Sequence, residues 1–166
     1  MSKGERVEIK KPEGYYCFAC GTANPIGLNL DFYRLGDKIC ADITLGKYHV
    51  GWSNISHGGI ISTLLDEVMS WAILYFKRIF FVTRKMDVKY IKPVVVGTPI
   101  TICGRLLKNN ASPKEIKVKA EIRDNQGNIL ARGTGYFVAI GKEKLSFVPN
   151  EAKQEIFSLI ENLPPL

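Results

Sequence analysis

Residues 57–76, HGGIISTLLDEVMSWAILYF, form the longest apolar stretch of the chain and decide its fold. Nearly every position after the two glycines is apolar, which indicates a helix that is buried around most of its circumference. The polar exceptions fall at spacings that place most of them along one stripe of a helix. They are Ser62, Thr63, Asp66, Glu67 and Ser70. The stretch therefore predicts a long helix that carries a carboxylate into apolar surroundings.

The start of this helix falls at Gly58 and Gly59. The first N–H groups of a helix have no acceptor within it, and the aligned peptide dipoles leave about half a positive charge there. An anion or a polarised carbonyl oxygen can bind at such an end. Glycine at these positions would let a substrate approach the backbone closely, although close packing of the helix against a sheet also favours glycine.

Strand-like alternation of apolar and polar residues lies on both sides of the helix. Residues 28–32 and 39–45 alternate around a turn at Gly36 and Asp37, which predicts a hairpin. Residues 46–56 read as a loop. After the helix, segments near 86–90, 98–107, 116–123 and 129–140 predict a meander of four further strands. The pattern favours an α+β arrangement, an antiparallel sheet of about six strands with the helix on one face.

The length of 166 residues suits one domain, predicted to span 1–166 with a core over about 17–140 and a peripheral C-terminal helix at about 150–163. Hydrophobic residues make up 46% and charged residues 23%, as in an ordinary globular protein. Asp66 and Glu67 interrupt the apolar stretch, so no membrane span is expected. The polar N-terminus lacks the apolar segment of a signal peptide, and a cytoplasmic location is the default expectation.

The net charge of +7 and the isoelectric point near 9.2 would permit nucleic acid, an anionic membrane or a polyphosphorylated ligand as partner. The basic residues are scattered through predicted strands and turns instead of forming a block, and nucleic-acid-binding motifs are missing from the sequence. We therefore expect neither nucleic acid nor a membrane as partner. Many of these residues are expected only to solvate the surface.

The four cysteines lie at positions 17, 20, 40 and 103 and are expected to be free thiols in a reducing cytosol. Cys17 and Cys20 form a C-x-x-C pair, which is half of a zinc site. No second pair follows, and His49 and His57 are the only histidines. A thioredoxin-like role is disfavoured because the residues after the pair read as loop. We expect a structural loop at Cys17 and Cys20 and no metal.

Several motifs together resemble the hotdog-fold acyl-CoA thioesterases of the 4-hydroxybenzoyl-CoA thioesterase superfamily, nearest to the phenylacetate-degradation type. They are CFACGTANPIGL at 17–28, HGG at 57–59, an acidic residue eight positions after the first glycine, and VKYIKPVVVG at 88–97. The resemblance covers roughly residues 17–140. It implies a curved antiparallel sheet wrapped around the helix and hydrolysis of a thioester between an acyl group and coenzyme A.

The resemblance also implies roles for particular residues. Asp66 corresponds to the catalytic carboxylate, as nucleophile or as general base for water, and Gly58 to the residue whose N–H polarises the thioester carbonyl. Thr83 corresponds to a hydroxyl near the reacting group. His57 and Gly59 complete the helix start, where a structural hydrogen bond is the more ordinary role for the histidine.

Coenzyme A would lie along Tyr90, Lys92 and the turn of Lys108, Asn109 and Asn110 by the same resemblance, although surface lysines there also serve solubility. Coenzyme A is part of the substrate, so no separate cofactor is implied.

One departure concerns the loop before HGG, where many relatives place Asn or Gln to orient substrate or water. This chain has Val50 and Gly51 there, and Asn54 is the candidate to replace that function.

Helix geometry adds a requirement that the motifs do not contain. Eight residues at about 1.5 Å each put Gly58 and Asp66 about 12 Å apart along one helix. One thioester cannot touch both, because catalytic contacts need about 3 Å. Two copies of the helix, antiparallel across a two-fold axis, would bring Gly58 of one chain to Asp66 of the other. We expect a dimer at least, and the resemblance favours a tetramer.

Two other functions fit the same fold. A non-catalytic acyl-CoA or fatty-acyl binding module would need no carboxylate facing the thioester, so Asp66 together with Gly58 favours the enzyme. An enoyl-CoA hydratase would need a catalytic Asp and His pair that cannot be placed in this sequence. For Asp66 itself, the alternative role is a buried, hydrogen-bonded carboxylate that serves packing specificity.

Overall fold

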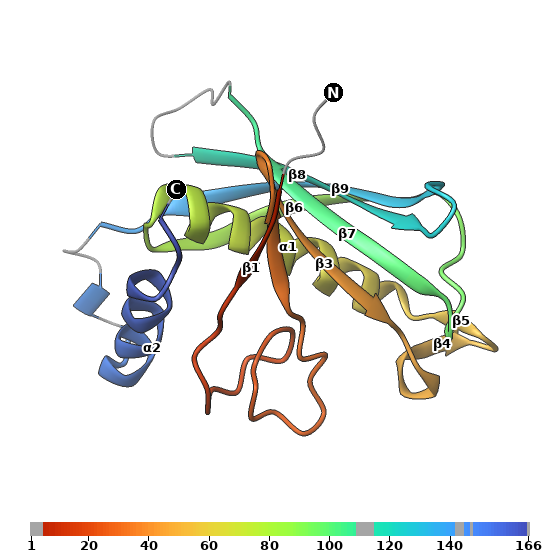
Figure 1. Ribbon diagram of the computed structural model, residues 1–166, viewed down its shortest axis with the longest axis horizontal. Helices are drawn as coiled ribbons and strands as arrows, with labels where there is room; N and C mark the ends of the chain where they lie inside the picture. The colour runs from red at the N-terminus through yellow and green to blue at the C-terminus, as the bar shows by residue number, and fades with distance from the viewer. Residues whose placement is uncertain (1–4, 109–114, 142–144, 147, 166) are drawn as a thin grey trace.

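The computed structural model describes residues 5–108, 115–141, 145–146 and 148–165 (Figure 1). Its elements, in chain order, are β1 (Arg6–Ile9), β2 (Phe32–Leu35), β3 (Lys38–Thr44), the short 3-10 turn η1 (Lys47–His49), β4 (Val50–Trp52), β5 (Ile55–Ser56), α1 (Gly58–Lys77), β6 (Phe81–Tyr90), β7 (Pro99–Leu106), β8 (Glu115–Asp124), β9 (Ile129–Ala139) and α2 (Asn150–Glu161).

Seven strands form one antiparallel sheet in the order β1-β2-β3-β7-β8-β9-β6, with α1 packed along one face (Figure 1). The α+β arrangement is the predicted one. The four strands after the helix are not a simple meander, however, because β6 crosses to the far edge and pairs with β9. Only β7, β8 and β9 follow one another as neighbours. Alternation predicts strands but carries no information about which strand lies at the edge.

The helix α1 begins one residue later than the apolar stretch, because His57 is its N-cap. Its buried face packs on the sheet and includes Trp71, which stacks on Phe32 with ring centroids 4.4 Å apart. By length and composition alone this helix could cross a membrane, at a mean hydropathy of 1.3. More than half of it is buried inside the fold, where the sheet covers the apolar side chains.

Three short strands were not predicted. β1 lies in a polar segment and pairs with β2, and Ile9 reaches the core. β4 and β5 pair with each other inside the segment predicted to be a loop. Conversely, Leu28 and Leu30 are buried but lie outside any strand, so the alternation there reflects burial of a loop. Segments of two to four residues are too short for a periodic signal.

Cys40 and Cys103 are joined by a disulfide, so the prediction of four free thiols is wrong for this pair. The two cysteines lie directly opposite each other on β3 and β7. Cross-strand neighbours have Cβ atoms close enough for a disulfide. The prediction failed because the sequence alone could not place the two strands side by side, where the two thiols become neighbours.

We predict that reducing this disulfide lowers the free energy of unfolding by about 2–4 kcal/mol, because the bond links residues 63 positions apart and restricts the unfolded chain. Urea unfolding with and without reductant measures the effect. The double variant Cys40→Ala/Cys103→Ala is the control and should be insensitive to reductant. Identical midpoints for the oxidised and reduced wild-type chain would contradict the prediction.

The C-terminal helix α2 lies beside the C-terminal end of α1, as Figure 1 shows. Arg78 ends α1 in the left-handed conformation, with φ of 54°. Its guanidinium donates to the carbonyl oxygens of Ile160, Leu163 and Pro164. One side chain therefore joins the end of α1 to the segment that ends α2, and Ile156, Leu159 and Ile160 of this helix also pack against the core.

Candidate active site

The carboxylate of Asp66 is half-buried on α1 and faces the start of β6. Thr83 Oγ1 donates a hydrogen bond of 3.1 Å to Asp66 Oδ1. Burial raises the pKa of Asp66 above its ordinary value, and the Thr83 hydrogen bond opposes part of that rise. The structure thus brings together two predicted site residues that are 17 positions apart. A carboxylate in this state is a stronger base than an exposed one.

The N–H groups of Gly58 and Gly59, at the N-terminus of α1, differ in whether they have a hydrogen-bond acceptor. His57 Nδ1 accepts the Gly59 N–H at 2.9 Å, and the His57 carbonyl accepts from Ile60 and Ile61. The Gly58 N–H has no acceptor within the described part of the chain. His57 therefore has the structural capping role. Gly59 is not free to bind substrate through its N–H, whereas Gly58 is.

Tyr90, at the end of β6, lies against the helix start. Its hydroxyl donates to the Gly58 carbonyl oxygen at 3.1 Å and is 2.7 Å from Ser62 Oγ. The pair of contacts fixes the position of the first helical turn relative to β6. Ser62 belongs to the polar stripe noted in the sequence, but its contact with Tyr90 depends on the strand crossing and could not be predicted.

A cavity of about 310 Å³ opens at Gly58. Its lining is mostly apolar and consists of Ile55, Ser56, Gly58, Ile61, Tyr90, Ile91, Lys92, Pro93, Val94 and Ala131. Three predicted residues, Gly58, Tyr90 and Lys92, therefore border one space. Ser56 was not predicted. It is 7% exposed, and its hydroxyl has no hydrogen-bond partner among the residues that the structure describes. A buried, unpaired hydroxyl beside a cavity is a candidate to bind a ligand.

Other predicted residues lie elsewhere. Asn54 is exposed in the turn between β4 and β5 and is not among the residues that line this cavity, so its proposed role in place of the missing Asn or Gln stays a prediction. Lys108 is exposed after β7. Asn109 and Asn110 lie outside the described residues.

Glu67 does not share the surroundings of Asp66. It accepts a hydrogen bond from Trp71 Nε1 at 3.1 Å and lies 3.9 Å from Cys17 Sγ. Burial raises the pKa of Glu67 to about 7. The two neighbouring carboxylates are rotated by about 100° on a helix, which separates the predicted catalytic position from the N-terminal loop.

One family of known proteins has a sequence model that matches part of this chain. Residues 54–131 match the family model of the thioesterase superfamily. A curated relative, verlamelin biosynthesis protein B from a Lecanicillium species, is 26% identical over 130 residues, which are 62% of this chain and 52% of that protein. This chain therefore spans about half the length of the curated relative it matches.

Three solved structures show a similar fold. A thioesterase superfamily protein has a TM-score of 0.68 at 23% identity, covering 74% of this chain and 60% of that one. The PaaI protein of the E. coli phenylacetic acid degradation operon has a TM-score of 0.62 at 17% identity, covering 69% and 81%. A Streptococcus mutans protein bound to acetyl-CoA has a TM-score of 0.58 at 20% identity, covering 64% and 83%. These likenesses confirm the hotdog fold.

Proposed function

We propose that the protein belongs to the thioesterase superfamily and hydrolyses acyl-CoA thioesters to a free acid and coenzyme A, at a site shared between two subunits. One observation carries the proposal. The strand β6 holds Asp66 at one end through Thr83 and Gly58 at the other end through Tyr90. A carboxylate and an unpaired helix N–H are the two groups that thioester hydrolysis needs.

The chemistry assigns a separate task to each group. The Gly58 N–H would hydrogen-bond to the thioester oxygen and stabilise the negative charge that develops there. Asp66 would either attack the carbonyl carbon directly or remove a proton from an attacking water. In both cases the carbon–sulfur bond breaks and coenzyme A leaves as the thiol after taking up a proton. If Asp66 attacks directly, the acyl-aspartyl anhydride that forms is then hydrolysed by water, which regenerates the carboxylate. Water supplies the oxygen that ends in the free acid.

The edge strand β6 suggests how two chains complete the site. In the described residues β6 pairs only with β9, and most of its side chains are exposed. Two copies could pair antiparallel about an axis between Met86 and Asp87. That register sets Thr83 of one protomer opposite Tyr90 of the other, and therefore places Asp66 near the Gly58 N–H of the second protomer. Such a dimer brings the two groups together, although Gly58 and Asp66 are about 12 Å apart within one chain.

The half-exposed stripe of α1 supports the same arrangement. Small or polar residues at Gly59, Ser62, Thr63, Asp66 and Ser70 are among the positions of this helix that the chain's own sheet leaves partly open. Small side chains allow a second helix to approach closely. A tetramer, made from two such dimers, remains a proposal that rests on the family resemblance alone.

Acyl-CoA is the proposed substrate class because of the cavity at Gly58 and because one structural relative binds acetyl-CoA. The apolar walls suit an acyl chain or the pantetheine arm, and Lys92 at its border suits a phosphate. No separate cofactor is required, and the cytoplasm, where acyl-CoA is available, is the proposed location.

The test is release of free thiol from a panel of aromatic and aliphatic acyl-CoAs by the purified full chain. The proposal expects turnover with at least one member that depends on Asp66. If no acyl-CoA is hydrolysed faster than by the Asp66→Asn variant, while calorimetry shows binding, the protein is an acyl-CoA binding module instead.

A further inference from the structure

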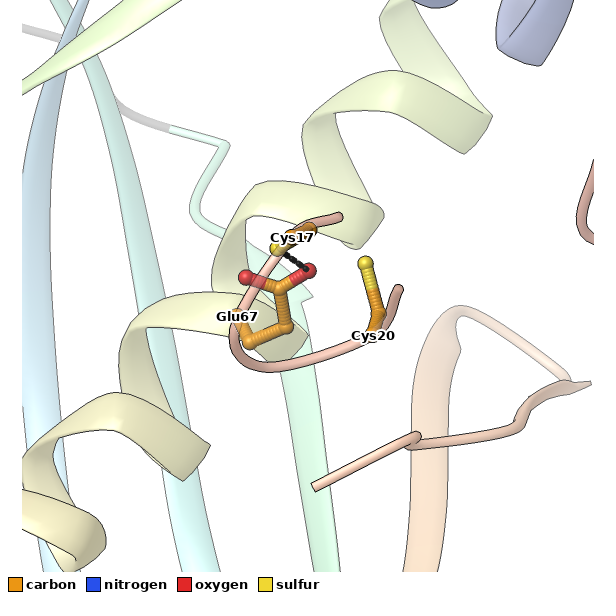
Figure 2. Close-up of side chains that lie close together, drawn as sticks. All are labelled: Cys17, Cys20 and Glu67. Carbon is orange, nitrogen blue, oxygen red and sulfur yellow. Dashed lines mark hydrogen bonds between the residues drawn. The ribbon is translucent and has the colours of Figure 1, made fainter. Parts of the chain in front are cut away.

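A second cluster of reactive side chains lies beside α1, on a different face from Asp66. Cys17 and Cys20 come from the loop before β2, and Glu67 comes from the middle of the helix (Figure 2). One donor atom from each residue lies within 4.8 Å of the other two. The expectation of no metal rested on a missing ligand set. The fold supplies a third ligand from a residue 50 positions after Cys17.

We propose that Cys17, Cys20 and Glu67 form a binding site for a zinc ion, with the fourth position open to water. Two thiolates and one carboxylate are ligands that zinc accepts, and three protein ligands with an open position are a known arrangement. Cys17 is exposed, so the open position can face solvent.

The distances suit a tetrahedral ion. Zn–S bonds of about 2.3 Å and Zn–O bonds of about 2.1 Å set neighbouring ligand atoms roughly 3.5–3.8 Å apart. Cys17 Sγ and Glu67 Oε1 are 3.9 Å apart. All three donor atoms lie within 4.8 Å of one another, so coordination of a central ion would need the separations to shorten by about 1 Å at most.

The loop that carries the two cysteines is built around a tight turn. Gly21 N–H donates to the Cys17 carbonyl oxygen at 2.8 Å, and a Cβ at Gly21 would lie 2.5 Å from Cys17 backbone atoms, so only glycine fits. Tyr15 Oη and Lys11 Nζ both donate to the Cys20 carbonyl oxygen. These contacts fix the backbone at both cysteines, whose thiols are not joined by a disulfide.

The chemistry of the donors also favours a cation. Zinc binds cysteine as the thiolate and glutamate as the carboxylate, so a divalent ion at this cluster would offset the negative charge that the three ligands bring together.

The test measures zinc in the purified full chain, kept reduced, after incubation with zinc and removal of the excess. We expect about one equivalent per chain, and cobalt in its place should give thiolate-to-cobalt charge-transfer absorption in the near ultraviolet. Cys17→Ser/Cys20→Ser should lose the metal and the absorption. Glu67→Gln, which keeps the size of the side chain, should weaken zinc binding by more than about ten-fold in competition with a chelating dye.

Asp66→Asn is the matched control, because it removes the neighbouring carboxylate from outside the cluster and should retain one equivalent. The cobalt spectrum of the wild-type chain tests the proposal even if the cysteine variant fails to fold. A reduced wild-type chain that takes up no zinc, or a double cysteine variant that still binds one equivalent, would overturn the proposal. Formation of a Cys17–Cys20 disulfide in a chain that takes up no zinc even when reduced would also overturn it and would assign the pair to redox chemistry.

Discussion

Replacing Asp66 with asparagine should lower kcat for acyl-CoA hydrolysis by about 10²- to 10⁴-fold, since the variant loses the nucleophile or general base. Acyl-CoA affinity should be unchanged or higher, because the amide keeps the size and hydrogen bonding of the carboxylate without its charge. The fold should also survive. A raised pKa means that the folded state favours the protonated carboxyl, so ionised Asp66 costs stability at neutral pH and its removal does not.

The measurements are steady-state thiol release, calorimetric binding of a non-hydrolysable acyl-CoA analogue and thermal unfolding. Asp37→Asn makes the same chemical change at an exposed turn and should behave as wild type. Because the ionised form of Asp66 is the active one, kcat/KM of the wild-type enzyme should fall on acidification at a pH above the ordinary aspartate pKa of about 3.9. Wild-type turnover by the Asp66→Asn variant would show that a residue other than Asp66 is the nucleophile or general base.

Replacing Gly58 with proline should lower kcat by about 10²- to 10³-fold, the usual effect of removing one donor to the oxyanion. Proline suits the first position of a helix and removes only the N–H group there. The preceding residue, His57, has φ of −61° and ψ of 135°, a conformation that proline permits before it. The variant therefore tests the Gly58 N–H group alone, because the helix is expected to remain folded.

Gly58→Ala is the matched control because it adds a side chain and keeps the N–H group. A Cβ at this position would lie 3.5 Å from the Tyr90 hydroxyl, an ordinary contact. Alanine should therefore retain most of the activity, and circular dichroism should show intact helix in both variants. Equal turnover by the proline and alanine variants would exclude the Gly58 N–H from catalysis.

The helix and the long strands could be predicted because their signal is local. The apolar residues at 57–76 and the alternation at 116–123 each specify an element without knowledge of the rest of the chain. The positions of Asp66 and Gly58 on that helix followed from spacing and from the resemblance. The structure adds their contacts with Thr83 and Tyr90, which arise because β6 runs antiparallel to α1 along its length.

The other features of the structure depend on which segments of the chain contact one another. The periodicity of apolar residues carries little information about such contacts. The disulfide needs β3 beside β7, and the Glu67 cluster needs the N-terminal loop to fold over α1. The edge position of β6 arises from a crossover that no local pattern records. Ser56 shows the same limit, because a serine in a loop becomes notable only when burial leaves its hydroxyl unpaired.

The shared site is tested most directly by mixing two inactive variants. Asp66→Asn and Gly58→Pro subunits, unfolded together in equal amounts and refolded, should form mixed dimers in which one site carries both changes and the other carries neither. Random assembly then makes about a quarter of all sites intact, so turnover should recover to about a quarter of the wild-type value. Activity no higher than that of either variant refolded alone, in a sample shown to contain mixed dimers, would contradict a site built from two subunits.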